Sequence, residues 1–219
     1  IPRKPGMSRD DLLLTNAKIM QAVLEDIKKY APNSKIIIVS NPLDAMVYAA
    51  LKILKFPREH VIGMAGILDS ARMSHFICEK LGYGAGQIES SVMGGHGDAM
   101  VPLVNYSTVA GVSLPELLSK EDIEDIVTKT KNGGLQIVKL LETGSAYYAP
   151  AHATSLMVEA ILYNNKKIYP CSVMLDGEYD CKNVVSGVPV MLGTPLTTFL
   201  QSCSVMLDGE YDCKNVVSG

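Results

Sequence analysis

The sequence predicts an α/β fold, in which half of a doubly wound parallel sheet is followed by an α+β region. Two observations predict this class. Up to Gly86, short uninterrupted apolar runs alternate with segments of helical periodicity, as strands buried on both faces alternate with crossover helices. After Gly86, the candidate strands follow one another closely and flank two long helical segments, which favours antiparallel pairing.

The first part of the chain contains three predicted helices and two predicted strands. Ser8 can cap the first helix, whose apolar positions keep a helical period as far as Tyr30. The continuous apolar run 35–39 predicts a buried strand. The next elements are a helix over 43–55, a strand over 61–64 and a helix over 68–81 that ends at Gly82.

The second part of the chain changes its pattern. We expect strands over 88–93 and 100–110, and then a long helix over 120–142 that Gly133 and Gly134 could bend. A further helix is expected over 149–164. The last predicted elements form an antiparallel meander over 167–175, 183–186 and 188–192.

Composition and charge exclude several classes of function. A net charge of −3 disfavours a general nucleic-acid-binding role. Lys52 and Lys55 interrupt the longest apolar stretch, and the residues 1–6 lack the apolar region of a signal peptide, so we expect neither membrane insertion nor secretion. The five cysteines form no CxxC pair, which predicts reduced thiols in a cytoplasmic protein. No two histidines lie four residues apart, and we expect no metal site.

The C-terminal region contains an identical repeat. Residues 171–187 read CSVMLDGEYDCKNVVSG, and residues 203–219 read the same. Solenoid units drift in sequence and need at least three copies for stability. The second copy is therefore interpreted as an aberrant duplication rather than as a repeat architecture.

The loop 94–98, with the sequence GGHGD, is the sharpest candidate for chemistry. Three glycines let the backbone turn tightly and leave the imidazole of His96 uncovered, which suits proton transfer near neutral pH. A turn histidine without a role is the competing interpretation. The other histidines, His60, His75 and His152, are interpreted as structural or solvent-facing. A serine hydrolase is disfavoured because no G-x-S-x-G motif occurs.

Several charged and polar residues form a second set of candidates. Asp69 and Arg72 share a helix face, either as a surface ion pair or as a histidine-orienting carboxylate beside a guanidinium that binds a substrate carboxylate. Arg3 and Arg9 lie on a loop that is either a solvated face or a lid over an anion. Asn41 follows a buried strand, where ligands bind in doubly wound folds.

Seven segments, taken in order, resemble the lactate/malate dehydrogenase family, and within it the malate dehydrogenases that are similar to lactate dehydrogenases. They read IPRKPGMSRDDLL, TNAKI, IIIVSNPLDAM, VIGMAGILDSAR, MGGHGDAMVPL, TGSAYYAPA and GVPVMLG, and they span residues 1 to about 193. The resemblance implies a Rossmann-type sheet, NAD as the cofactor, and hydride transfer between NAD(H) and malate or oxaloacetate. It also implies a homodimer or homotetramer for the complete protein.

The resemblance assigns a role to each candidate. His96 would give and take the proton, and Asp69 would hold its ring. Arg72 would bind the carboxylate beside the reacting carbon, and Arg9 would polarise the carbonyl. Asn41 would contact both substrate and cofactor, and the other cofactor contacts would be Asn16, Val39 and Ser40, with Ser145 as a further pocket residue.

Arg3 decides the substrate in this interpretation. An arginine at this position accompanies dicarboxylates in the family, whereas a glutamine accompanies lactate. The second carboxylate of oxaloacetate would be neutralised by Arg3, and leaving such a charge unpaired in a closed pocket costs about 2–5 kcal/mol. We therefore expect malate and oxaloacetate over lactate and pyruvate.

The sequence also departs from the family. No G-x-G-x-x-G motif occurs, although that turn binds the pyrophosphate of NAD in the family. We expect a remnant of the NAD-binding Rossmann domain over 1–65, a catalytic domain over 66–202 and an aberrant repeat over 203–219. We also expect NADH to bind this chain weakly or not at all. Two alternatives stay open: a lactate dehydrogenase, and a non-catalytic truncated remnant that lacks the cofactor pocket.

Overall fold

Helix α1 (Arg9–Tyr30) opens the part of the chain that the computed structural model describes, namely residues 9–142, 144–193 and 197–198. The predicted alternation of strand and helix is confirmed. It comprises β1 (Ile36–Ile38), α2 (Leu43–Leu54), the 3-10 turn η1 (Arg58–His60), β2 (Val61–Gly63) and α3 (Gly66–Leu81). Strands β1 and β2 are parallel, with Ile36 opposite Val61. Helix α3 ends at Gly82, whose φ of +70° suits a residue without a side chain.

Each of the two strands predicted after Gly86 is divided, so that part of the prediction was wrong. The first becomes β3 (Ile88–Glu89) and β4 (Val92–Gly94), and the second becomes β5 (Met100–Pro102) and β6 (Thr108–Val109). The chain changes sheets at each division, because β4 pairs with β5 in the larger sheet whereas β3 pairs with β6 in a smaller one. Strand β7 (Val112–Ser113) completes the smaller sheet among the described residues. The turns η2 (Ala85–Gln87) and η3 (Val104–Tyr106) adjoin these strands.

The predicted long helices are confirmed. After the short α4 (Leu114–Leu117), helix α5 (Lys120–Leu141) begins at Ser119, whose hydroxyl accepts a hydrogen bond from the N–H of Asp122 at 3.2 Å. It continues without a break through its two glycines. Helix α6 (Tyr148–Leu162) follows. Among the described helices, none combines the length and apolar character needed to span a membrane.

The predicted meander is a two-stranded hairpin of β8 (Lys167–Asp176) and β9 (Lys182–Leu192), joined at the turn η4 (Glu178–Asp180). The division expected at Gly187 was wrong. A Cβ atom at this position would lie 2.5 Å from the carbonyl oxygen of Gly94. Gly187 therefore continues the strand and lets β9 approach β4 closely.

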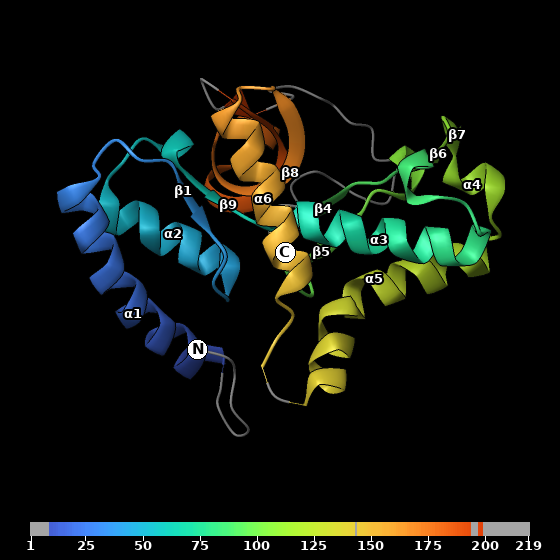
Figure 1. The fold of residues 1–219 in the computed structure, drawn as a ribbon, viewed down its shortest axis with the longest axis horizontal. Coiled ribbons are helices and arrows are strands. Elements are labelled where there is room, and N and C mark those ends of the chain that lie inside the picture. Colours follow the sequence, from blue (N-terminus) through green and yellow to red (C-terminus); the bar gives the residue numbers. More distant parts are fainter. Residues whose placement is uncertain (1–8, 143, 194–196, 199–219) are drawn as a thin grey trace.

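The hairpin lies in the middle of the larger sheet. The strand order is β1-β2-β8-β9-β4-β5, with β10 (Thr197–Thr198) paired to β9. The parallel pair β1–β2 is thus extended by antiparallel strands, and Gly63 lies opposite Ser172. Figure 1 shows the hairpin between the N-terminal layer of α1 and α2 and the layer of α3 and α5.

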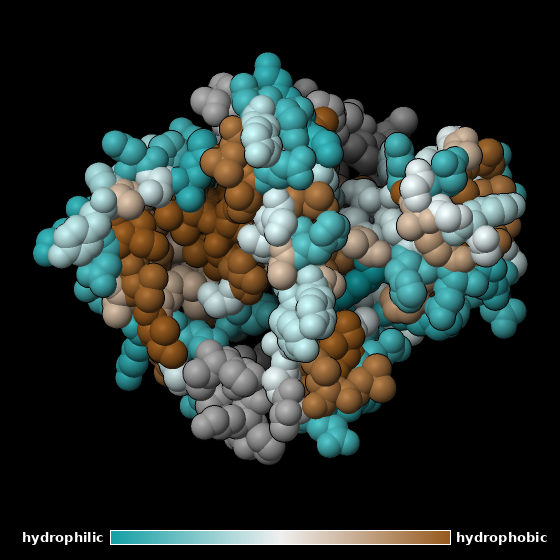
Figure 2. Space-filling model, in the orientation of Figure 1, coloured by the Kyte–Doolittle hydropathy of each residue, from teal (hydrophilic) through white to brown (hydrophobic). Residues whose placement is uncertain are grey.

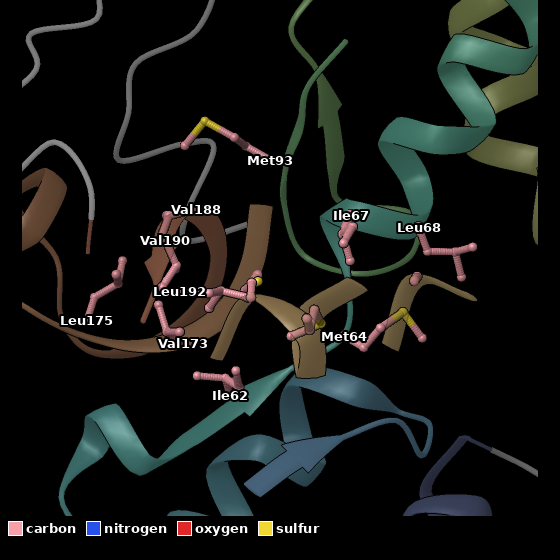
Figure 3. Close-up of a cluster of buried hydrophobic side chains, with 14 of the residues drawn as sticks. Ile62, Met64, Ile67, Leu68, Met93, Val173, Leu175, Val188, Val190 and Leu192 are labelled. Carbon is pink, nitrogen blue, oxygen red and sulfur yellow. The ribbon is translucent and has the colours of Figure 1, made fainter. Parts of the chain in front are cut away.

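The main hydrophobic core lies around this hairpin. Figure 3 shows buried side chains of this core, which come from β2, the first turn of α3, β4 and the two hairpin strands. Leu175 and Leu192 are fully buried there, beside Met157 of α6. Burial of each such side chain contributes about 1.5–3 kcal/mol. The hairpin is therefore what binds the parallel strands and the helices into one body.

Candidate active site

The loop between β4 and β5 presents His96. The backbone of Gly94 has a φ of +81° and that of Gly97 a φ of +152°, which a residue with a side chain adopts only under strain. The N–H of Gly95 donates to the carbonyl of Ala99 at 3.2 Å, and the N–H of Met100 donates to Gly97 at 3.1 Å. This tight turn places the imidazole over the N-terminal end of α3.

His96, Asp69 and Arg72 form one connected cluster, as expected from the sequence. Nδ1 of His96 lies 2.8 Å from Oδ2 of Asp69. Nη1 of Arg72 donates to Oδ1 of the same carboxylate at 3.0 Å. Asp69 is 1% exposed, so its charge is balanced by these two neighbours rather than by water. The interpretation of Asp69 and Arg72 as a surface ion pair is therefore wrong.

The start of α3 brings Asp69 to the histidine. Gly66, the first residue of α3, packs so closely against the carbonyl of Val92 and the ring of Pro170 that a side chain would not fit. Ser70 accepts a hydrogen bond from the N–H of Val92 at 2.9 Å. The first turn of α3 is thus fixed against β4, the strand that leads into the histidine loop.

The environment of His96 favours the charged imidazolium. Burial lowers the pKa of His96, but the hydrogen bond to Asp69 and the negative charges of Asp69 and Asp44 raise it more, against a smaller opposing effect of Arg72. The pKa of His96 therefore lies above its ordinary value of 6.5. A raised pKa keeps the ring ready to donate a proton at neutral pH.

Helix α5 covers the other side of Arg72. Cβ atoms at Gly133 and Gly134 would lie 3.3 Å from Cδ and 3.5 Å from Nη1 of Arg72. The two glycines thus let α5 pack directly against the arginine side chain. Nε of Arg72 is buried and has no hydrogen-bond partner within the described part of the chain. Asp69 engages only Nη1 and the side chain is 16% exposed, so the other Nη donors of the guanidinium are the ones that suit an anionic ligand.

Asp44 is a site residue that the sequence analysis missed. It lies in the first turn of α2, and its Oδ2 accepts a hydrogen bond from the backbone N–H of His96 at 2.8 Å. Its Oδ1 accepts from Oγ of Ser172 at 2.5 Å. An acidic residue in the first turn of a helix is common because it complements the helix dipole, so the sequence contained no signal for this contact.

The expected cofactor residues lie at the carboxyl end of β1. Val39 is 41% exposed, and Ser40 and Asn41 are exposed as well. Asn16 is 6% exposed, and its Nδ2 donates to the carbonyl of Asn41 at 2.7 Å. This contact fixes the turn after β1, so that the geometry of Asn16 supports a positioning contribution rather than direct contact with a ligand.

Some of the expected site residues are not placed. Arg3 lies outside the described residues, and so does the side chain of Arg9, although Arg9 is the first residue of α1. Ser145 is exposed, between α5 and α6. His75 and His152 are exposed, whereas His60 is half-buried. Their assignments remain predictions from the sequence.

Two sequence profiles of one family cover nearly all of this chain. The NAD binding domain of lactate/malate dehydrogenase matches residues 1–63, and the alpha/beta C-terminal domain of lactate/malate dehydrogenase matches residues 67–214. The chain belongs to the lactate/malate dehydrogenase family. This family membership confirms the resemblance that the seven segments indicated.

Individual members of the lactate/malate dehydrogenase family resemble the chain closely. A malate dehydrogenase of Aliarcobacter butzleri is 65% identical over 193 residues, which cover 88% of this chain and 62% of the relative. The chain thus spans about three fifths of the length of the curated relatives it matches.

Solved structures of the lactate/malate dehydrogenase family share the fold. The malate dehydrogenase of Aeropyrum pernix superposes with a TM-score of 0.92 at 42% sequence identity. The superposition covers 100% of this chain and 70% of the Aeropyrum pernix chain. The lactate dehydrogenase of Eimeria maxima with NADH and oxamate has a TM-score of 0.88 at 39% identity, covering 100% and 67% of the two chains. The fold therefore does not distinguish a malate from a lactate dehydrogenase.

Proposed function

We propose that the chain carries the substrate-binding and proton-transferring residues of an NAD-dependent malate dehydrogenase, which interconverts malate and oxaloacetate. One observation carries the proposal. The buried carboxylate of Asp69 is shared between Nδ1 of His96 and Nη1 of Arg72. A proton donor and a carboxylate-binding guanidinium are thereby fixed to the same group.

The proton chemistry follows from the two ring nitrogens of His96. Asp69 engages Nδ1, so exchange of a proton with a substrate is left to Nε2. When oxaloacetate is reduced, the imidazolium donates the Nε2 proton to the oxygen of the former carbonyl. When malate is oxidised, neutral Nε2 takes the hydroxyl proton. Asp69 keeps the ring in place and stabilises its charged form in both directions.

Arg72 is suited to bind the carboxylate beside the reacting carbon. Asp69 occupies only Nη1 in the described structure, and a guanidinium offers five N–H donors. Its side chain is 16% exposed, so a carboxylate there is partly shielded from water. The substrate carbon would then lie near both the guanidinium and His96, which is the orientation that the reaction requires.

The residues at the end of β1 fit the nicotinamide side of a dinucleotide. Val39, Ser40 and Asn41 are exposed at the carboxyl end of a parallel strand, where such cofactors bind, and Asn16 fixes their turn. NAD would supply the hydride acceptor or donor there. The family profile that matches residues 1–63 and the NADH complex of the Eimeria maxima relative support this cofactor.

Arg3 supports malate over lactate. It is the positive charge expected to neutralise the second carboxylate of oxaloacetate, which pyruvate lacks. The curated relatives named malate dehydrogenase agree with this choice. The proposal further includes a homo-oligomeric, cytoplasmic protein, in keeping with five cysteines that form no CxxC pair.

The decisive experiment measures NADH consumption with oxaloacetate and with pyruvate. It compares the chain with a chimera to which the part of the Aliarcobacter butzleri relative without a counterpart here has been added. We expect the chimera to reduce oxaloacetate preferentially, and His96→Gln to lower its kcat by about 10²–10⁴-fold. A folded, NADH-binding chimera that is inactive toward both substrates would support the non-catalytic remnant instead.

Arg3→Gln tests the substrate assignment in the same chimera. Removing the positive charge should raise the KM for oxaloacetate and shift the preference toward pyruvate, because the second carboxylate of oxaloacetate would lose its counter-charge whereas pyruvate has no second carboxylate. Arg3→Lys is the matched control, since it keeps the charge but not the bidentate geometry. An unchanged preference in Arg3→Gln would refute the assignment of Arg3.

A further inference from the structure

We propose that Asp44 is a positioning residue for His96: its carboxylate fixes the loop that carries the imidazole and places a second negative charge near the ring. The inference rests on the proposed proton-transfer role of His96 and adds a partner to it besides Asp69. Asp44 itself is not expected to touch the substrate.

The first step is the connection that Asp44 makes. Its Oδ2 binds the backbone N–H of His96 at 2.8 Å, and its Oδ1 binds Oγ of Ser172 at 2.5 Å. One carboxylate in the first turn of α2 therefore joins the β4–β5 loop to β8. Both of its contacts are made to residues far away in the sequence, so they depend on the assembled fold.

The second step concerns the loop itself. Gly94 and Gly97 have positive φ angles, and glycine loses more conformational freedom on folding than any other residue. Two backbone hydrogen bonds close the turn, from Gly95 to Ala99 and from Met100 to Gly97, but neither involves the backbone of His96. The carboxylate of Asp44 adds a constraint at the His96 N–H itself. It therefore complements Asp69, which holds the ring at Nδ1.

The third step is electrostatic. The negative charge of Asp44 raises the pKa of His96 in the same direction as that of Asp69, whereas burial and the positive charge of Arg72 lower it. Asp69 and Arg72 approach from α3 and Asp44 approaches from α2. Asp44 thus acts on both the position and the charge of the imidazole, through contacts that do not involve Asp69.

The test uses the 219-residue chain and needs no substrate. The titration of His96 is followed by NMR, with its signal assigned by comparison with His96→Gln, and hydrogen exchange is measured at the His96 amide. In Asp44→Asn the side-chain carbonyl can still accept from the His96 N–H, and its amide can face Ser172. We expect the His96 titration to shift to lower pH while the amide stays protected.

The companion variants separate charge from position. Asp44→Ala should show the same lowered titration and, in addition, about tenfold or faster exchange at the His96 amide, the size expected from losing a hydrogen bond to a charged acceptor. Ser172→Ala keeps both the charge of Asp44 and its bond to His96, and should leave the titration unchanged.

The inference is overturned if a folded Asp44→Asn variant titrates like the wild type, or if Ser172→Ala shifts the titration as far as Asp44→Asn does. If Asp44→Ala does not fold, the Asn and Ser172 variants decide the matter. Because these measurements need no turnover, an inactive chimera would refute the proposed function and leave the inference about Asp44 standing.

Discussion

At the scale of single residues, the acid–base behaviour of the site depends on one buried carboxylate with two partners. Asp69 holds the imidazole of His96 through one oxygen and the guanidinium of Arg72 through the other. Burial lowers the pKa of His96, and the negative charge of Asp69 raises it. Removing that charge should therefore lower the pKa of His96. Proton transfer and substrate binding should therefore respond together to a change at this residue.

We expect Asp69→Asn to shift the pH dependence of the reaction. In the proposed mechanism the reduction of oxaloacetate needs protonated His96, so we expect kcat/KM in that direction to be high at low pH and to fall as pH rises through the raised pKa of His96. Without the Asp69 charge, the fall moves to lower pH. The measurement is the pH–rate profile of the chimera, with Asp98→Asn as a matched control that removes an exposed charge from the same loop. Equal profiles in wild type and Asp69→Asn would contradict this expectation.

The residues of the site were only partly predictable from the sequence. His96 was visible because its glycines are adjacent to it, and Asp69 with Arg72 because helical spacing places them on one face. Asp44 could not be recognised in the sequence, because its two hydrogen-bond partners lie 52 and 128 residues away. Such contacts depend on the order of strands in the sheet, which local patterns do not contain.

At the scale of elements, the glycine pair Gly133 and Gly134 lets α5 pack against the side chain of Arg72. Glycine in a helix interior costs about 1 kcal/mol relative to alanine. We expect Gly133→Ala to raise the KM for oxaloacetate, since its Cβ would lie 3.3 Å from Cδ of Arg72, which Asp69 holds in place. Gly134→Ala, with a wider clearance of 3.5 Å, is the control and should mainly stabilise the helix. Steady-state kinetics and thermal unfolding of both variants test this, and an equal KM in the two would contradict it.

The turn of the β8–β9 hairpin is fixed by an ion pair between Arg58 and Glu178. Arg58 donates to both carboxylate oxygens of Glu178, at 3.0 and 2.7 Å. The hydrogen bond from Arg58, against the effect of burial, lowers the pKa of Glu178 to about 2. The repeat places Glu210 at the equivalent position of its second copy, but Arg58 is already engaged.

We therefore expect Glu178→Gln to destabilise the chain by about 2 kcal/mol at neutral pH, and Glu210→Gln to leave its stability unchanged. The folded pKa of Glu178 is depressed, so its contribution is present above the ordinary value of 4.5 and is lost as pH falls toward about 2. Urea unfolding at pH 7 and pH 3 measures both effects. A comparable loss in Glu210→Gln would contradict the assignment of the turn to the first copy.

The elements themselves were largely predictable, and the errors have physical causes. Helices of α1, α2, α3, α5 and α6 bury one face, so their apolar residues keep the helical period. The predicted strands 183–186 and 188–192 left out Gly187. In the structure the close approach of β4 requires this glycine, and β9 continues through it. The two strands predicted after Gly86 were too long, because the local sequence of a strand does not reveal where the chain passes from one sheet to the other.

At the scale of the whole molecule, apolar side chains remain exposed along α1. Ile19, Val23 and Tyr30 lie on one face of the helix and are 51%, 53% and 73% exposed; Figure 2 shows apolar side chains along this helix. We expect Val23→Glu to weaken self-association, measured by light scattering after size-exclusion chromatography. Lys18→Glu adds the same side chain beside that face and is the control. If the wild type is larger than a monomer and Val23→Glu has the same molar mass, self-association through this face of α1 is contradicted.

Because the β8–β9 hairpin lies in the middle of the larger sheet, the sheet can be completed only after the hairpin has been synthesised. Until Ser172 and Gly187 have been synthesised, β2 and β4 have no strand between them, and the carboxylate of Asp44 has only one of its two partners. The loop that carries His96, although encoded before the middle of the chain, is thus expected to reach its final conformation only after translation has passed β9. A reading-frame change between residues 97 and 171 would therefore abolish the site without altering His96, Asp69 or Arg72.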